Sequence, residues 1–233
     1  LMPEFGSTVE EIEADGFTPA AKVDLDLHDD TPLAVARAMG TGTQRFADAY
    51  QRLNLDLLVV LGDRFEMHAA AVAAVPFLLP IAHIAGGSVT RGTIDDSFRH
   101  SITKLASLHF VETETHCARV RQMGEEAWRV HLTGALNLDN IADLPVLPLA
   151  EMNHRFALDL NPAAPPLLVT FHPVTRDFAG TRRHAEALLA ALADAGQPVV
   201  FTYPNADTGG RVVIDLIDAF VREHPRARAV PNL

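Results

Sequence analysis

Four groups of charged, polar or glycine residues each follow an apolar run, where a strand of a parallel sheet would end. They are Gly62, Asp63 and Arg64; Gly86, Gly87 and Ser88; Asp95, Asp96, Arg99 and His100; and His172. Open α/β sheets bind their ligands beyond the carboxyl ends of the strands, so these groups are candidates for one site. Carboxylates, cations and a histidine around one cleft could serve acid–base chemistry on an anionic substrate.

The acidic residues also have a purely structural explanation. Asp63, followed three residues later by Glu66, has the spacing of a helix N-cap and its capping box. One of Asp95 and Asp96 is expected to cap the next helix, and Arg99 could simply pair with Asp95 at the i,i+4 spacing. Spacing alone leaves both explanations open.

The other groups have structural alternatives as well. Gly86 and Gly87 could form an ordinary turn, and His172 could be a hydrogen-bonded histidine at a strand end. The segment "NADTGG", which begins at Asn205, could be a helix N-terminus that holds an anion or a turn with good capping residues.

The elements that would position these groups follow a βαβ rhythm from residue 55 onward, which predicts parallel, doubly wound sheets. The expected strands are 55–61, 79–87, 108–113, 128–134, 166–173, 198–204 and 227–230. Helical patterns are expected at 64–77, 95–107, 115–124, 182–196 and 209–224. A proline-rich linker at 143–165 with one short helix separates an expected domain of residues 1–142 from one of residues 166–233.

Composition excludes several classes of protein. The 233 residues carry a formal net charge of −11, which argues against a general nucleic-acid binder. No apolar stretch approaches the roughly 18 residues of a membrane span. The single cysteine, Cys117, fits a reducing, cytoplasmic setting, and the 11 scattered histidines show no metal-ligand pattern, so no metal site is expected.

Taken together and in order, these segments resemble one family. The block "IDDSFRHSITKL" is the most specific, and the matching segments span nearly the whole chain. The others are "PEFGSTVEEIEADGF", "DLLVVLGDRFEMHAAA", "PIAHIAGGSVTRGT", "GALNLDNI", "TFHPVT" and "FTYPNADTGGR". The chain is similar to the UDP-N-acetylglucosamine 2-epimerase family, in particular the hydrolysing branch that supplies N-acetylmannosamine for sialic acid synthesis.

The resemblance implies a GT-B-like fold, two Rossmann-like domains facing a cleft, with further segments before Leu1 and after Leu233. It implies a UDP-sugar substrate, no cofactor and a homodimer or homotetramer. By the same resemblance Asp63, Asp95, Asp96 and His172 are catalytic, and the remaining site residues bind substrate. These substrate-binding residues are Arg64, Gly86, Gly87, Ser88, Arg99 and Asn205.

In the implied reaction, UDP leaves C1 as the C2 proton is lost, and water adds to the resulting glycal to give N-acetylmannosamine. Ser88 departs from the family pattern, in which an acidic residue usually follows the glycine pair. Serine can hydrogen-bond a sugar hydroxyl but cannot act as a carboxylate base. The alternatives are the same chemistry on a UDP-diacetamido-trideoxyhexose of a legionaminic-type pathway, or a sugar-nucleotide-binding protein without turnover. A glycosyltransferase of the same fold is less well supported, because nothing in the sequence indicates an acceptor site.

Overall fold

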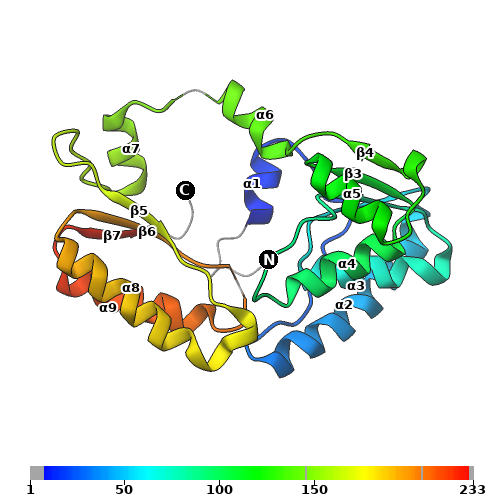
Figure 1. Ribbon diagram of the computed structural model, residues 1–233, viewed down its shortest axis with the longest axis horizontal. Helices are drawn as coiled ribbons and strands as arrows, with labels where there is room; N and C mark the ends of the chain where they lie inside the picture. Colours follow the sequence, from blue (N-terminus) through cyan, green and yellow to red (C-terminus); the bar gives the residue numbers. More distant parts are fainter. Residues whose placement is uncertain (1–7, 145, 206, 231–233) are drawn as a thin grey trace. The chain divides into compact units, whose positions relative to one another are not determined.

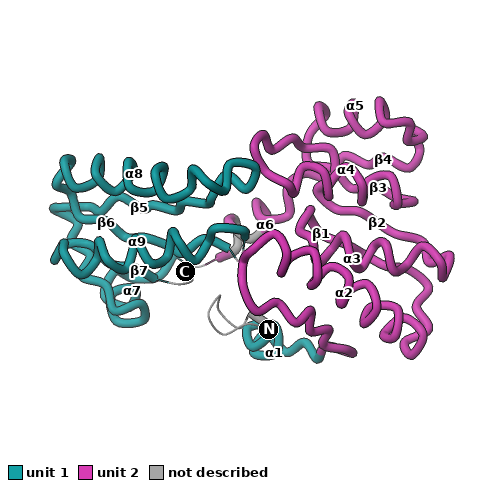
Figure 2. Tube along the Cα trace, turned by 90° about the horizontal axis from the view of Figure 1, so that it is seen from below, with its two compact units in different colours: residues 1–18, 145–233 teal, residues 19–144 magenta. Residues whose placement is uncertain are grey.

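The computed structural model describes residues 8–144, 146–205 and 207–230. These residues form two compact units, which Figure 2 distinguishes by colour. One unit consists of residues 19–144, and the other combines 8–18 with the described part of 145–233. The second unit therefore begins inside the expected linker, and residues 8–18 group with it rather than with the chain that follows them.

The first unit is built on a four-stranded parallel sheet in the order β1-β2-β3-β4. Its strands are β1 (Leu58–Leu61), β2 (Ile81–Ile84), β3 (Leu108–Val111) and β4 (Val130–Leu132). The connecting helices are α3 (Phe65–Ala74), α4 (Asp95–Leu105) and α5 (Glu114–Gln122), with short 3-10 turns η2 (Val75–Phe77) and η3 (Ala127–Arg129). Parallel strands joined in the order β1-β2-β3-β4 by right-handed crossovers, the usual hand, have their connecting helices on one face of the sheet.

A long helix that was not among the expected ones, α2 (Pro32–Leu53), packs against α3. It begins at Thr31, whose hydroxyl accepts from the Ala34 amide at 3.2 Å, and Pro32 supplies a preset φ angle at its first position. Figure 1 shows α2, α3 and α4 side by side. Tyr50 of α2 joins the core between these helices and the sheet.

The second unit contains a three-stranded parallel sheet in the order β5-β6-β7. Its elements are α1 (Thr8–Ala14), α7 (Leu149–Phe156), β5 (Leu167–Thr170), η4 (Thr175–Gly180), α8 (Thr181–Ala195), β6 (Val199–Thr202), α9 (Gly210–Glu223) and β7 (Ala227–Val230). Alternate residues of β6 face opposite sides: Val199 and Phe201 lie in the core with α8 and α9, and Val200 packs with α7 residues. Figure 1 shows α8 and α9 together on one face of this sheet.

The seven expected strands are all present; six are shorter than their expected ranges, and β7 has the expected bounds of 227–230. The short helix α6 (Leu136–Asp143) ends the first unit, and α7 is the helix expected within the linker. Among the described helices, none combines the length and the apolar character that a membrane crossing requires.

Candidate active site

The candidate site of the first unit lies at the carboxyl ends of β1 and β2. After β1, Gly62 adopts φ +80° and its amide donates to the Ile84 carbonyl at 3.0 Å. This left-handed residue turns the chain out of the strand, so that Asp63 follows at the edge of the sheet. Helix α3 then begins at Phe65, which is buried against Val35 of α2.

Arg99 is the centre of the site. Its side chain is only 8% exposed and donates to the Asp63 carboxylate, which lies 36 positions earlier in the sequence. The same guanidinium donates to the Thr90 hydroxyl at 2.9 Å, the Ser88 carbonyl at 3.2 Å and the Asp96 carboxylate at 3.4 Å. One buried cation therefore bridges two carboxylates from different elements.

The expected helix caps are wrong in both places. The N-cap position of α3 is Arg64, which makes no side-chain capping bond, and the N-cap position of α4 is Ile94, which makes none either. Asp63 lies one residue too early to cap α3 and is taken by Arg99, since an ionised donor forms a stronger bond than a backbone amide. Asp95 and Asp96 instead open α4 as its first two residues, where their negative charge suits the helix dipole.

Asp96 ties the loop before α4 to the helix. Its carboxylate accepts from the Thr90 amide at 2.9 Å and from Arg99, and it lies 3.8 Å from Nε2 of His100. On this helix Arg99 pairs with Asp96 at the i,i+3 spacing. Thr90, which spacing did not single out, is thus a member of the site through both its amide and its hydroxyl.

Arg64 forms a separate ion pair next to this cluster. Its Nε and Nη2 atoms each donate to the Glu66 carboxylate at 3.2 Å, and its guanidinium lies 5.6 Å from the centre of the Phe65 ring. Both partners are about one-third exposed, at 31% and 29%. Glu66 therefore acts as the partner of Arg64 and not as half of a capping box.

Packing explains both glycines of the pair after β2. A Cβ atom on Gly86 would lie 2.9 Å from Nδ1 of His83. Gly87 has φ +81°, and a Cβ there would lie 2.7 Å from the His116 carbonyl. Arg119 donates to the Gly87 carbonyl and holds this turn against α5. The structural explanation of the glycine pair is thus sufficient, and their role in substrate binding stays a prediction.

Replacing Gly87 with alanine is expected to destabilise the first unit by about 3 kcal/mol, from left-handed strain plus a clash with backbone that cannot move away. Gly124→Ala is the matched control, because Gly124 has φ +97° and its nearest neighbour, Lys104 Nζ, would be 3.8 Å from the new Cβ. The control should cost about 1 kcal/mol, the strain alone. Urea unfolding measures both, and equal losses would contradict the clash.

The second unit holds the remaining predicted residues. His172 lies just past β5, is 45% exposed, and has its Nδ1 atom 4.0 Å from the Asp207 carboxylate. The Asn205 carbonyl accepts from the Asp207 amide at 2.7 Å, and α9 begins after Gly209 at φ +91°. The structure thus brings His172 together with the loop that contains Asn205.

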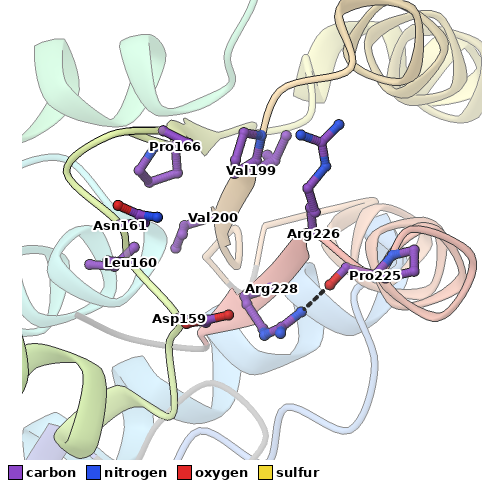
Figure 3. Close-up of a pocket in the computed structure, with 11 residues that line it drawn as sticks. Asp159, Leu160, Asn161, Pro166, Val199, Val200, Pro225, Arg226 and Arg228 are labelled. Carbon is purple, nitrogen blue, oxygen red and sulfur yellow. Dashed lines mark hydrogen bonds between the residues drawn. The ribbon is translucent and has the colours of Figure 1, made fainter.

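A cavity of about 200 Å³ in the second unit lies elsewhere, at the amino-terminal ends of β5, β6 and β7 (Figure 3). Its two arginines donate hydrogen bonds to backbone carbonyls: Arg228 to that of Pro225 at 2.7 Å, and Arg226 to that of Gly196. Ligands of open α/β sheets bind at the opposite ends of the strands, so this cavity is not the candidate site. Among the described residues no cluster of three histidine, cysteine or acidic side chains could hold a metal ion.

Burial perturbs two histidines in the first sheet. Burial lowers the pKa of His83 to about 4, and it also lowers the pKa of His109. The unfolded chain then binds a proton at His83 between about pH 6.5 and pH 4 that the folded chain does not bind. Stability contributed by this group is therefore full above pH 6.5 and is lost as the pH falls through that window.

We expect the first unit to lose roughly 3 kcal/mol at His83 between pH 7 and pH 4, given 1.36 kcal/mol per pKa unit. Urea midpoints measured across this range check the prediction. The His83→Gln variant, which has no titrating group there, should show a shallower decline than the parent chain. An identical decline would mean that His83 titrates normally in the folded state.

Comparison with known proteins decides the family. The family model for UDP-N-acetylglucosamine 2-epimerase matches residues 1–233. The chain belongs to the UDP-N-acetylglucosamine 2-epimerase family. It is 33% identical over 235 residues to a GDP/UDP-N,N'-diacetylbacillosamine 2-epimerase (hydrolyzing) of Campylobacter jejuni, which covers 100% of this chain and 60% of that protein. It is also 32% identical over 215 residues to a UDP-N-acetylglucosamine 2-epimerase of Neisseria meningitidis, covering 92% of this chain and 55% of that protein.

A solved structure of this epimerase family shares the fold. The Methanocaldococcus jannaschii UDP-GlcNAc 2-epimerase, solved in complex with UDP-GlcNAc and UDP, matches with a TM-score of 0.74 at 15% identity. The match covers 99% of this chain and 63% of that structure. The expected α/β, GT-B-like fold class is confirmed. The chain spans about 60% of the length of these family members.

Proposed function

We propose that the chain acts as a hydrolysing 2-epimerase on a UDP-activated 2-acetamido sugar, releasing UDP and the free sugar with inverted C2. The observation that carries this proposal is the Arg99 bridge between Asp63 and Asp96 at the carboxyl ends of β1 and β2, in a chain of the 2-epimerase family. The two carboxylates differ in their partners, and two acid–base groups are what a two-step reaction requires.

The chemistry explains why carboxylates and a cation are needed together. A sugar C2–H bond is barely acidic until the C1–O bond to UDP begins to break and leaves positive charge at C1. A carboxylate then takes the C2 proton, UDP departs with the bonding electrons, and a 2-acetamido glycal remains. Water subsequently adds its oxygen to C1, and C2 receives a proton on the opposite face.

Asp63 is the proposed base, because it lies at the rim of the site, is 22% exposed and is oriented by Arg99. Asp96, with Asp95 beside it, is proposed to serve the second proton transfer, with His100 at 3.8 Å as its neighbour. Arg99 holds both carboxylates in place and offsets part of their negative charge before substrate binds. His172 and Asn205 of the second unit are proposed, from the family resemblance, to contact the nucleotide sugar.

Two substrates are candidates. UDP-N-acetylglucosamine corresponds to the name of the matched family and of the Neisseria relative. The name of the Campylobacter relative, whose match covers the entire chain, favours UDP-N,N'-diacetylbacillosamine as the second candidate. A role in sialic acid synthesis, a cytoplasmic setting and a homodimeric or homotetrameric state stay predictions.

Incubation of the full chain with each UDP-sugar separately tests the proposal. We expect UDP and a free sugar of inverted C2 configuration, with one substrate turned over far faster than the other. UDP release without C2 inversion would contradict the epimerase and favour a simple hydrolase. Tight binding of both UDP-sugars without any product would favour the binding protein without turnover.

Position 88 offers a test of the acid–base chemistry, because the Ser88 carbonyl accepts a hydrogen bond from Arg99 and the residue therefore lies next to the site. Ser88→Glu is expected to raise turnover of UDP-N-acetylglucosamine by roughly 10-fold, by supplying a further acid–base group at the site. The control is Ser88→Gln, which has the same size but cannot exchange a proton. Equal rates for the two variants would contradict an acid–base role at position 88.

A further inference from the structure

His83 is a completely buried side chain that the proposed reaction does not use. It lies in β2, in register with Val60 of β1 and one strand away from His109 of β3. Its exposed fraction is 0%. A buried imidazole is costly unless its nitrogen atoms are hydrogen-bonded, so its partners indicate what it holds.

Both ring nitrogens have a partner, and the partners come from different elements. Nε2 lies 2.8 Å from the Gly62 carbonyl, which can only accept, so Nε2 carries the proton. Nδ1 lies 3.2 Å from the hydroxyl of Thr103 on α4. That hydroxyl, itself completely buried, also lies 3.0 Å from the Arg99 carbonyl, so its one proton is shared between two acceptors, Nδ1 of His83 and this carbonyl.

These contacts connect the two backbone segments that carry the ion pair. Gly62 directly precedes Asp63, and Thr103 lies one helical turn after Arg99. The imidazole therefore spans the gap between the loop that presents the carboxylate and the helix that presents the guanidinium. Gly86 completes the arrangement, because a Cβ there would press on the ring at 2.9 Å from Nδ1.

We propose that His83 is a positioning residue that fixes the Asp63 loop against α4 and thereby sets the geometry of the Asp63–Arg99 pair. The expected effect of His83 on turnover rests on the proposed function, whereas its effect on the Asp63–Arg99 pair does not. The hydrogen-bond partners of the His83 ring are the Gly62 carbonyl and the Thr103 hydroxyl, and neither Asp63 nor Asp96 is among them. His83 therefore acts through the backbone at Gly62 and through Thr103. Glutamine can reach the Gly62 carbonyl with an amide N–H, whereas leucine fills a similar volume without a donor.

The first test measures kcat and KM for His83→Leu and His83→Gln. We expect leucine to lower kcat by about 10²-fold with KM within about threefold, the loss expected when a reacting group is misplaced by an ångström. Glutamine should restore kcat to within about fivefold of the parent chain, because it keeps the donor to Gly62. A glutamine variant as slow as the leucine variant would overturn the proposal.

His109→Leu is the matched control. His109 is the register partner of His83 in the next strand and is equally buried, but its hydrogen bond goes to Glu125 and not to the site. Its removal should destabilise the unit while leaving kcat nearly unchanged. Equal losses of kcat for His83→Leu and His109→Leu would mean that both act only through stability, and would overturn the positioning role.

A second measurement needs no activity and separates this proposal from the proposed function. A double-mutant cycle of Asp63→Asn and Arg99→Gln gives the coupling of the pair in unfolding experiments. Repeated in the His83→Gln and His83→Leu backgrounds, the coupling should persist with glutamine and fall by at least about half with leucine. Unchanged coupling in the leucine background would overturn the positioning role of His83. Absence of turnover with either UDP-sugar would defeat only the proposed function, because the coupling is measured by unfolding and needs no activity.

Discussion

Arg99→Leu should abolish measurable turnover and destabilise the first unit by about 3–5 kcal/mol, the cost of leaving buried charges without their partner. Arg99 is 8% exposed and holds Asp63 and Asp96, which are 22% and 24% exposed. Without the guanidinium, the Asp63 and Asp96 carboxylates would repel each other in an environment with little water to screen their charges. Turnover and urea unfolding are measured on the same preparation.

The control for this substitution is Arg45→Leu, which also removes an arginine from an ion pair of the same unit. The Arg45–Asp26 pair is 40% and 46% exposed, so solvent and salt screen it, and its loss should cost no more than about 1 kcal/mol. A comparable loss of stability in the two variants, or an active Arg99→Leu enzyme, would contradict the central place of Arg99.

Asp63→Asn should lower kcat by roughly 10²–10⁴-fold, the usual contribution of a general base, while KM changes by only a few fold. Asparagine keeps the size of the side chain and one oxygen that can accept from Arg99. Since Asp63 does not cap α3, no loss of helix capping is expected to complicate the measurement. Steady-state kinetics with the preferred UDP-sugar provides the readout.

Asp56→Asn is the matched control, because Asp56 precedes the same strand at its other end and is exposed. Its turnover should equal that of the parent chain. Turnover of Asp63→Asn within about threefold of this control would remove Asp63 from the chemistry and leave it with a structural role as the partner of Arg99.

The strands were predictable because each is a short apolar run bounded by polar residues, as at 198–204 around β6. Helix α2 was missed, although its apolar and polar residues separate onto two helical faces as clearly as those of α4, which was predicted. Its buried face includes the small residues Ala38, Gly42 and Ala49, which do not stand out in the sequence as core residues. Its small residues allow close packing against α3: a Cβ on Gly42 would lie 3.3 Å from the Cβ of Ala69 in α3.

The sequence predicted which residues belong to the candidate site, but not which of them pair with one another. Apolar runs ending in acidic residues pointed to Asp63 and Asp96, but local spacing offered helix capping as an equally good explanation for Asp63 and for one of Asp95 and Asp96. The partner of Asp63 is Arg99, 36 positions away, and contacts at that separation leave no local periodic signal. The same holds for His83 and Thr103, which are joined across 20 positions.

In the proposed reaction, carboxylates at the ends of β1 and β2 remove and return a proton at C2 of a UDP-sugar. The most direct test is the reaction in D2O, followed by proton NMR of the released sugar. We expect UDP and a free sugar of inverted C2 configuration that carries deuterium at C2. An inverted product that retains its original hydrogen at C2, or UDP release with C2 unchanged, would contradict the proposed reaction.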